Sequence, residues 1–266
     1  RARAKVVAIT SGKGGVGKSN VALNLAIAAW RRGGRVCVID ADLGMANLDV
    51  LCGLTPAATL ADVVSGAKRI EDVAVRTPFG VHLVPGANGI AYLADLPDEG
   101  RTRLLAAMQT LERGADLIVI DTGAGASRNV IKIAAAADEC VVVTTPEPTS
   151  ITDAYAVVKL VSREREHGRI LILVNQADSG EHAERVARRI TSVARQFLRV
   201  DVEYAGFVPS DPNVPRSVRM RQPFVTVFPS TAASAGIGRL AQRYNGEHAS
   251  GDNGGFLSRL KRLIRR

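Results

Sequence analysis

Eight consecutive residues carry the clearest chemistry in this chain. Residues 12–19 read GKGGVGKS and fit G-x-x-x-x-G-K-[ST], the pattern of a phosphate-binding loop. Their four glycines let the backbone curl around an anion with its N–H groups pointing inward. Lys18 is expected to reach the β- and γ-phosphates, and the Ser19 hydroxyl to ligate Mg²⁺. The pattern predicts a nucleoside triphosphate site; the alternative is a glycine-rich turn without a ligand.

Two segments must position this loop. Val6–Thr10 is an apolar run of strand length, and residues 18–31 have the pattern of a helix. The loop therefore joins a strand to a helix N-terminus, where the helix dipole also favours phosphate.

Acidic residues end two further predicted strands. Asp40 and Asp42 lie at the end of Arg35–Asp40, and Asp121 ends Leu117–Asp121. Carboxylates at these places can face Mg²⁺ and the attacking water. An apolar run that ends in Asp is weak evidence alone, but it becomes strong about 100 residues after a phosphate loop.

Strand-like and helical patterns alternate along the whole chain. The strands are predicted at 6–10, 35–40, 81–84, 117–121, 140–144, 170–174 and 203–208, and the helices at 18–31, 101–114, 150–165, 181–197 and 231–244. Alternation of this kind implies an α/β fold, here a P-loop NTPase three-layer sandwich. Its central sheet is mostly parallel, with helices on both faces.

Composition and charge restrict the functional classes. The 266 residues are enough for one large core, and no apolar run approaches the ~20 residues of a membrane span. Residues 1–5 and 254–266 together hold eight basic and no acidic residues, so +1 of the net charge of +9 remains for residues 6–253. This distribution argues against nucleic acid as a partner. The cluster Arg216, Arg219 and Arg221 is either a solvated face or a contact for an acidic partner or phosphate.

The three cysteines, Cys37, Cys52 and Cys140, have no C-x-x-C spacing. They are expected to be structural thiols in a reducing cytosol, and the missing motif counts against an iron–sulfur carrier.

The loop SGKGGVGKS resembles the deviant Walker A loop of the MinD/ParA ATPases, with Lys13 as its signature lysine. The resemblance covers roughly residues 5–245. It implies an ATP-dependent homodimer in which two subunits enclose two ATP molecules and each Lys13 crosses to its partner's phosphates. A cation near the γ-phosphate stabilises the transferred charge. It also implies ATP hydrolysis with Mg²⁺, slow unless a partner stimulates it. The alternative is that Lys13 is a solvated loop lysine.

The same resemblance assigns further roles. Asp42 would lie in switch I and position the attacking water, while Asp40 would support the loop or the surroundings of the metal. Asn47 would assist near the γ-phosphate. Asp121 would hold Mg²⁺ through water, and residues 122–125 would form switch II.

The resemblance also implies residues at the base and at the subunit interface. Asn175 would read adenine, and the loop containing Pro209 and Asp211 would contact the base. Glu147 and Asp153 would face the partner subunit. The alternatives are a helix-capping Asn175, a turn proline at 209 and a capping pattern over residues 150–153.

The predicted sites can be stated as sets. The catalytic set is Lys13, Lys18, Asp42 and Asp121, and the metal set is Ser19, Asp42 and Asp121. The nucleotide-binding set is Gly12, Lys13, Gly14, Gly15, Val16, Gly17, Lys18, Ser19, Asn20, Glu147, Asn175, Pro209 and Asp211.

Three stretches, 40–66, 121–127 and 146–160, resemble the flagellar-number regulators of the FlhG (FleN) type more than division-site MinD. FlhG-type proteins bind an FlhF-type GTPase through an N-terminal segment with a DQAxxLR-like motif, which this sequence does not show. That GTPase and flagellar switch or basal-body proteins are the implied partners. The alternatives are MinD-type division-site selection, ParA-type DNA partitioning and a metabolic enzyme on the same fold.

The last eleven residues, FLSRLKRLIRR, predict a basic amphipathic helix. Its apolar residues fall within an arc of about 120°; they are Phe256, Leu257, Leu260, Leu263 and Ile264. We expect an ATPase domain over residues 1–244, a flexible linker over 245–255 and a membrane-targeting helix over 256–266. The protein would be cytoplasmic and would associate reversibly with lipids of the plasma (inner) membrane. The alternative is a tail that packs on the domain or frays.

Overall fold

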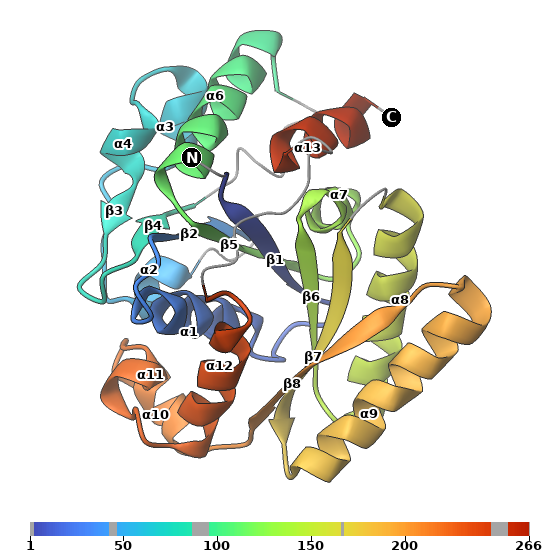
Figure 1. The fold of residues 1–266 in the computed structure, drawn as a ribbon. Helices are drawn as coiled ribbons and strands as arrows, with labels where there is room; N and C mark the ends of the chain where they lie inside the picture. Colours follow the sequence, from blue (N-terminus) through green and yellow to red (C-terminus); the bar gives the residue numbers. More distant parts are fainter. Residues whose placement is uncertain (1–2, 43–46, 87–95, 166–167, 246–254, 266) are drawn as a thin grey trace.

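The computed structural model describes residues 3–42, 47–86, 96–165, 168–245 and 255–265. Its centre is a sheet with strand order β3-β4-β2-β5-β1-β6-β7-β8 (Figure 1). All seven predicted strands are confirmed: β1 (Lys5–Ser11), β2 (Val36–Ala41), β4 (His82–Val84), β5 (Leu117–Ala124), β6 (Glu139–Thr144), β7 (Arg169–Ala177) and β8 (Val202–Pro209). They pair in parallel. The prediction missed β3 (Val75–Arg76), which pairs antiparallel with β4 and is too short to show a pattern.

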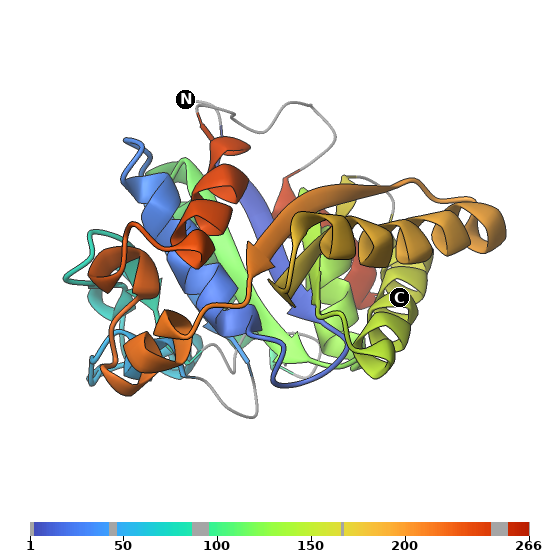
Figure 2. The same cartoon turned by 90° about the horizontal axis from the view of Figure 1, so that it is seen from below.

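Helices cover both faces of the sheet, which confirms the three-layer fold (Figures 1 and 2). One layer contains α1 (Lys18–Trp30), α2 (Leu48–Leu51), α10 (Asn213–Arg219), α11 (Phe224–Val227) and α12 (Ala232–Gln242). The other contains α3 (Leu60–Ser65), α4 (Ile70–Val73), α6 (Asp98–Gly114), α7 (Arg128–Ala136), α8 (Pro148–Glu164), α9 (Gly180–Val193) with its π-helical extension η1 (Ala194–Leu198), and α13 (Phe256–Arg265). Strands β1, β2 and β6 are buried along their whole length because both of their faces are covered.

The five helices predicted within residues 1–244 all form within a few residues of their expected ends. The helix expected at 150–165 begins earlier, because Pro148 occupies its first turn, where a fixed φ suits a helix. Ser150 therefore lies inside α8 rather than at its N-cap, and the alternative capping pattern over residues 150–153 was wrong. The Ser150 hydroxyl instead accepts a hydrogen bond from the backbone of Thr145 at 3.0 Å.

The tail helix forms as α13, but its apolar side contacts the domain. Phe256, Leu257, Leu260 and Leu263 are buried in the same core as residues of α6 and α7. The side chain of Ile264 lies outside the described residues. The alternative of a tail packed on the domain is therefore the one that this structure shows, and most of residues 245–255 lie outside the description.

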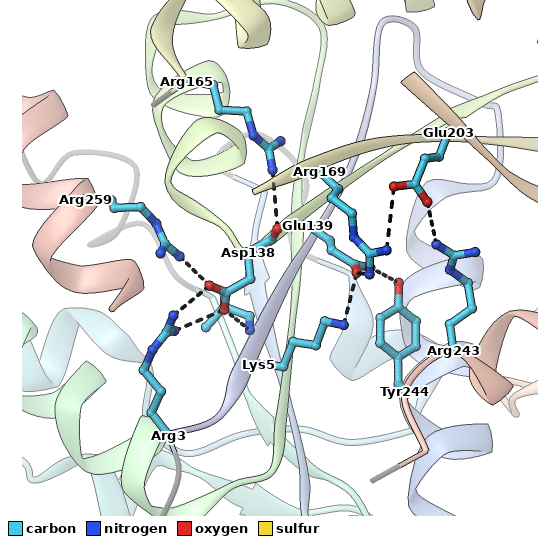
Figure 3. Close-up of polar contacts among 11 residues, drawn as sticks. Arg3, Lys5, Asp138, Glu139, Arg165, Arg169, Glu203, Arg243, Tyr244 and Arg259 are labelled. Atoms are coloured by element: carbon cyan, nitrogen blue, oxygen red, sulfur yellow. Dashed lines mark hydrogen bonds and ion pairs between the residues drawn. The ribbon is translucent and has the colours of Figure 1, made fainter. Parts of the chain in front are cut away.

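Polar contacts hold the docked tail as well. Arg259, expected on the solvated side of the helix, is buried; its Nε donates to the carbonyl oxygen of Ala136 at 2.7 Å, and its guanidinium lies 2.6 Å from Asp138. Asp138 also binds Arg3 at 2.9 Å, so one carboxylate contacts both the start of the chain and the tail (Figure 3). Burial alone would raise the pKa of Asp138, but the hydrogen bonds from Arg3 and Val6 and the Arg259 charge keep it below its ordinary value.

The neighbouring Glu139 gathers a second group of polar side chains (Figure 3). Its carboxylate pairs with Lys5 at 3.0 Å and with Arg169, and it accepts a hydrogen bond from the Tyr244 hydroxyl at 2.9 Å. Glu139 thus binds Tyr244, which precedes the segment that leads to α13, and Asp138 binds Arg259 within α13.

No helix in the described parts of the chain is long and apolar enough to cross a membrane.

Candidate nucleotide site

The carboxyl ends of three adjacent strands form the site. Asp121 of β5 is in register with Ile9 of β1 and with Asp40 of β2. The loop that follows β1 leads directly into α1, whose N-cap, Gly17, makes no side-chain capping hydrogen bond. The predicted phosphate loop therefore lies beside both acidic strand ends, where α/β folds bind ligands.

Two glycines of the loop are required by close packing. A Cβ on Gly12 would overlap backbone atoms of Asp153 in α8, and a Cβ on Gly17 would overlap the amide of Asn175. Gly17 also has φ +83°, in the left-handed region that favours glycine. Helix α8 and strand β7 therefore pack closely against the loop and restrict its shape.

Lys18 joins the loop to the acidic strand ends. Its Nζ lies 2.6 Å from Asp121 Oδ1 and 4.0 Å from Asp42, and the Lys18 and Asp121 side chains are both buried. Burial raises the pKa of Asp121, although the charge of Lys18 and hydrogen bonds from Lys18 and Ser19 oppose this. The predicted catalytic residues Lys18, Asp42 and Asp121 are therefore brought together.

The same cluster has the donors that Mg²⁺ prefers. Asp121 Oδ2 is buried and has no hydrogen-bond partner among the described residues, while the Ser19 hydroxyl bonds to the same carboxyl group. A hydroxyl and a carboxylate with a spare oxygen fit a hydrated Mg²⁺. Ser19 and Asp121 would hold the ion, which would screen the phosphate charge once nucleotide is bound.

Asp40 supports the segment after β2 rather than facing the lysines. Its carboxylate accepts hydrogen bonds from the backbone N–H groups of Asp42, Asn47 and Leu48 at 3.1, 2.9 and 3.0 Å. It therefore binds the backbone at the start of α2. This agrees with the supporting role expected for Asp40. The Asn47 side chain makes no capping contact there, so its predicted assistance stays a prediction.

Asp40 should make stability depend on pH. Burial raises the pKa of this carboxyl from 3.8 to about 6. The folded state then binds the proton more tightly than the unfolded state, so this contribution is present below pH 3.8 and is lost as the pH rises through 6. Relative to an Asp40→Asn variant, the parent should lose about 2 kcal/mol of unfolding free energy between pH 4 and pH 7. Urea unfolding of both proteins across this range measures the difference; parallel curves would contradict it.

Lys13 is partly exposed and has partners within its own chain. Its Nζ lies 2.8 Å from the Glu147 carboxylate and 3.2 Å from the Thr149 hydroxyl, both at the start of α8. Glu147, which was expected to face the partner subunit, therefore contacts Lys13 of its own chain in this structure. Thr149 was missed, although it lies in the segment PEPTSITDAY that the sequence singled out.

The residues predicted at the base have local partners. Asn175 Nδ2 donates to the carbonyl oxygen of Val16 at 2.7 Å and so supports the phosphate loop. Asp211 accepts from the backbone N–H groups of Asn213 and Ala233 at 2.9 and 3.3 Å. Pro209 ends β8 beside α12. Their predicted contacts with adenine stay predictions.

The three cysteines are buried, free thiols, and burial raises the pKa of each to about 12.

Within the described ranges, no group of three or more His, Cys, Asp or Glu side chains could hold a metal ion.

Comparisons with known proteins agree with this geometry. The ParA family model, described as NUBPL iron-transfer P-loop NTPase, matches residues 2–244. The chain belongs to the MinD/ParA family of P-loop ATPases. It is 41% identical to the antiactivator FleN of Pseudomonas aeruginosa over 90% of this chain and 85% of FleN. It is 32% identical to the flagellum site-determining protein YlxH of Helicobacter pylori, with 89% and 80% coverage.

A solved structure has the same fold. The septum site-determining protein MinD of Pyrococcus horikoshii, complexed with Mg-ADP, aligns with TM-score 0.73 and 26% identity, over 91% of this chain and 96% of that one. As a family member this chain is an ATPase.

Proposed function

We propose that this ATPase is an FlhG-like switch that regulates the number or placement of flagella. The observation that carries the proposal is the 41% identity to FleN across nearly the whole ATPase domain, together with the similarity to YlxH. An FlhF-type GTPase and flagellar switch proteins are the proposed partners. Division-site selection is the second candidate, supported by the MinD-like fold.

Deletion of the gene in its own organism separates the two candidates. The expected result is a changed number or position of flagella, counted by electron microscopy, with septa still at mid-cell. Displaced septa with normal flagella would overturn the flagellar role and favour the division role. Complementation with the parent gene and with a Lys18→Ala variant shows whether the effect needs the nucleotide site.

The switch proposed here is an ATP-held homodimer. Lys13 must leave Glu147, 2.8 Å away, before it can reach the phosphates of a partner subunit. This pair is exposed, so its loss costs little, within the ~0–1 kcal/mol of surface ion pairs. Binding of ATP and Mg²⁺ at Lys18, Ser19 and Asp121 would supply the anionic target that attracts the partner's Lys13.

Reversible membrane association through α13 is the second part of the switch. The four residues buried against the domain, Phe256, Leu257, Leu260 and Leu263, are also the ones that would enter the bilayer. Burial of four such side chains contributes roughly 6–12 kcal/mol in either place, so the domain and the membrane compete on similar terms. Two tails on one dimer gain avidity of ~10²–10⁴, which is enough to shift this balance toward the membrane.

A further inference from the structure

A cavity of about 820 Å³ lies away from the nucleotide site. It reaches the amino end of β2 at Val36 and Cys37, whereas the phosphate loop lies at the carboxyl ends of the strands. Its walls come from the ends of α1 and α6, from α4 and from β3 and β4. The volume is in the range of small-molecule sites.

The wall of this cavity is largely apolar. Ile70, Ala74, Leu111 and Ala115 line it, together with the indole of Trp30. The Trp30 ring lies directly on Gly80, where a Cβ would overlap the ring atoms and where φ is +96°. One face of the indole is thus packed on glycine, while 37% of Trp30 stays exposed.

Most cations at the rim have partners, but one does not. Arg31 donates to the carbonyl oxygen of Val225 at 2.6 Å, and Arg35 pairs with Asp116 at 2.6 Å. Arg76 has no hydrogen bond or ion pair among the described residues, and the same holds for the neighbouring imidazole of His82.

Arg76 and His82 are directly opposed across the antiparallel pair β3–β4, so their side chains lie on the same face of the sheet. Both are exposed and both line the cavity. Glu71 is the carboxylate at the same rim. An apolar wall beside two hydrogen-bond donors, one always charged, is complementary to an amphiphile with a negative head.

We propose that this cavity binds a small amphiphilic anion, with an apolar chain or ring against Trp30 and a carboxylate or phosphate head at Arg76 and His82. Burial of apolar surface would supply most of the affinity, and the head would fix the orientation. The site is independent of the nucleotide loop and does not rest on the flagellar role.

Trp30 is the only tryptophan of the chain, so its fluorescence reports occupancy. Titration of the full chain with dodecanoate, below its micelle concentration, should change the emission of Trp30 and saturate. Dodecyl phosphate should bind comparably, and dodecanol at least fivefold more weakly.

Three variants test the geometry. Arg76→Gln should weaken dodecanoate binding about threefold to tenfold, the effect of losing one exposed charge-assisted hydrogen bond. Glu71→Gln, a change of opposite sign on the same rim, should strengthen it about twofold to threefold. Ala74→Phe should obstruct the apolar wall and weaken saturable binding at least tenfold while ADP binding stays at the parent level, which shows that the variant folds.

The proposal fails if dodecanoate leaves Trp30 emission unchanged, or if Ala74→Phe binds it as the parent does. It also fails if dodecanol binds as tightly as dodecanoate, because the rim charges would then select nothing. Equal affinities for the Arg76→Gln and Glu71→Gln variants would likewise overturn the placement of the head.

Discussion

An Asp42→Ala variant is expected to hydrolyse ATP at least ~100-fold more slowly than the parent while it still dimerises with ATP. The Asp42 carboxylate lies 4.0 Å from Lys18 Nζ, and its Oδ1 lies 3.6 Å from where a Cβ on Gly123 would stand. It is thus between the phosphate lysine and the predicted switch II, where a carboxylate can orient water. Positioned acid–base groups contribute ~10²–10⁴-fold to rates.

Phosphate release measures turnover, and light scattering with a non-hydrolysable ATP analogue measures dimerisation. Asp49→Ala is a suitable control, because this nearby carboxylate accepts a hydrogen bond from Val50 N in its own helix. Lys13→Ala should behave differently from Asp42→Ala by losing the dimer as well as the activity. Hydrolysis at the parent rate in the Asp42→Ala protein would refute its catalytic assignment.

Two single-charge variants of α13 are expected to change membrane binding in opposite directions. Arg259→Gln removes the ion pair with Asp138 and the hydrogen bond to Ala136, which should weaken docking by about 1–3 kcal/mol. The loss of one cation weakens attraction to an anionic bilayer by only ~1 kcal/mol. Lys261→Gln loses the same charge, but Lys261 is exposed on the docked helix, so it loses no docking contact of this kind.

Co-sedimentation with vesicles rich in anionic lipid, in the presence of ADP, should therefore show more binding for Arg259→Gln, by up to about 30-fold, and about fivefold less for Lys261→Gln. The parent should bind better with a non-hydrolysable ATP analogue than with ADP. Equal binding of the parent in both nucleotides would refute the ATP-driven switch. Reduced binding of both variants would show that the docked helix does not compete with the membrane.

The phosphate loop, the strands around it and the amphipathic tail could all be predicted from the sequence. These features depend on local patterns. The loop GKGGVGKS is recognisable from its own glycines and lysines, and a strand covered on both faces is apolar throughout. The acids at the ends of β2 and β5 were predicted for the same reason, since parallel strands bring their carboxyl ends to one edge. Six further helices in the described residues were missed: α2, α3, α4, α7, α10 and α11. Of these, α2, α4 and α11 contain too few residues to show a period.

The pairing of charged side chains could not be predicted, because it depends on how distant segments pack. Lys13 meets Glu147 and Lys18 meets Asp121 across more than 100 residues of chain. The helix FLSRLKRLIRR was equally suited to a bilayer or to a protein groove, because its pattern fixes only that one side must be buried. The apolar surface of α7 and the carboxylate of Asp138 come together only when β1, β6 and α7 pack, so the sequence of the tail alone could not show where it docks.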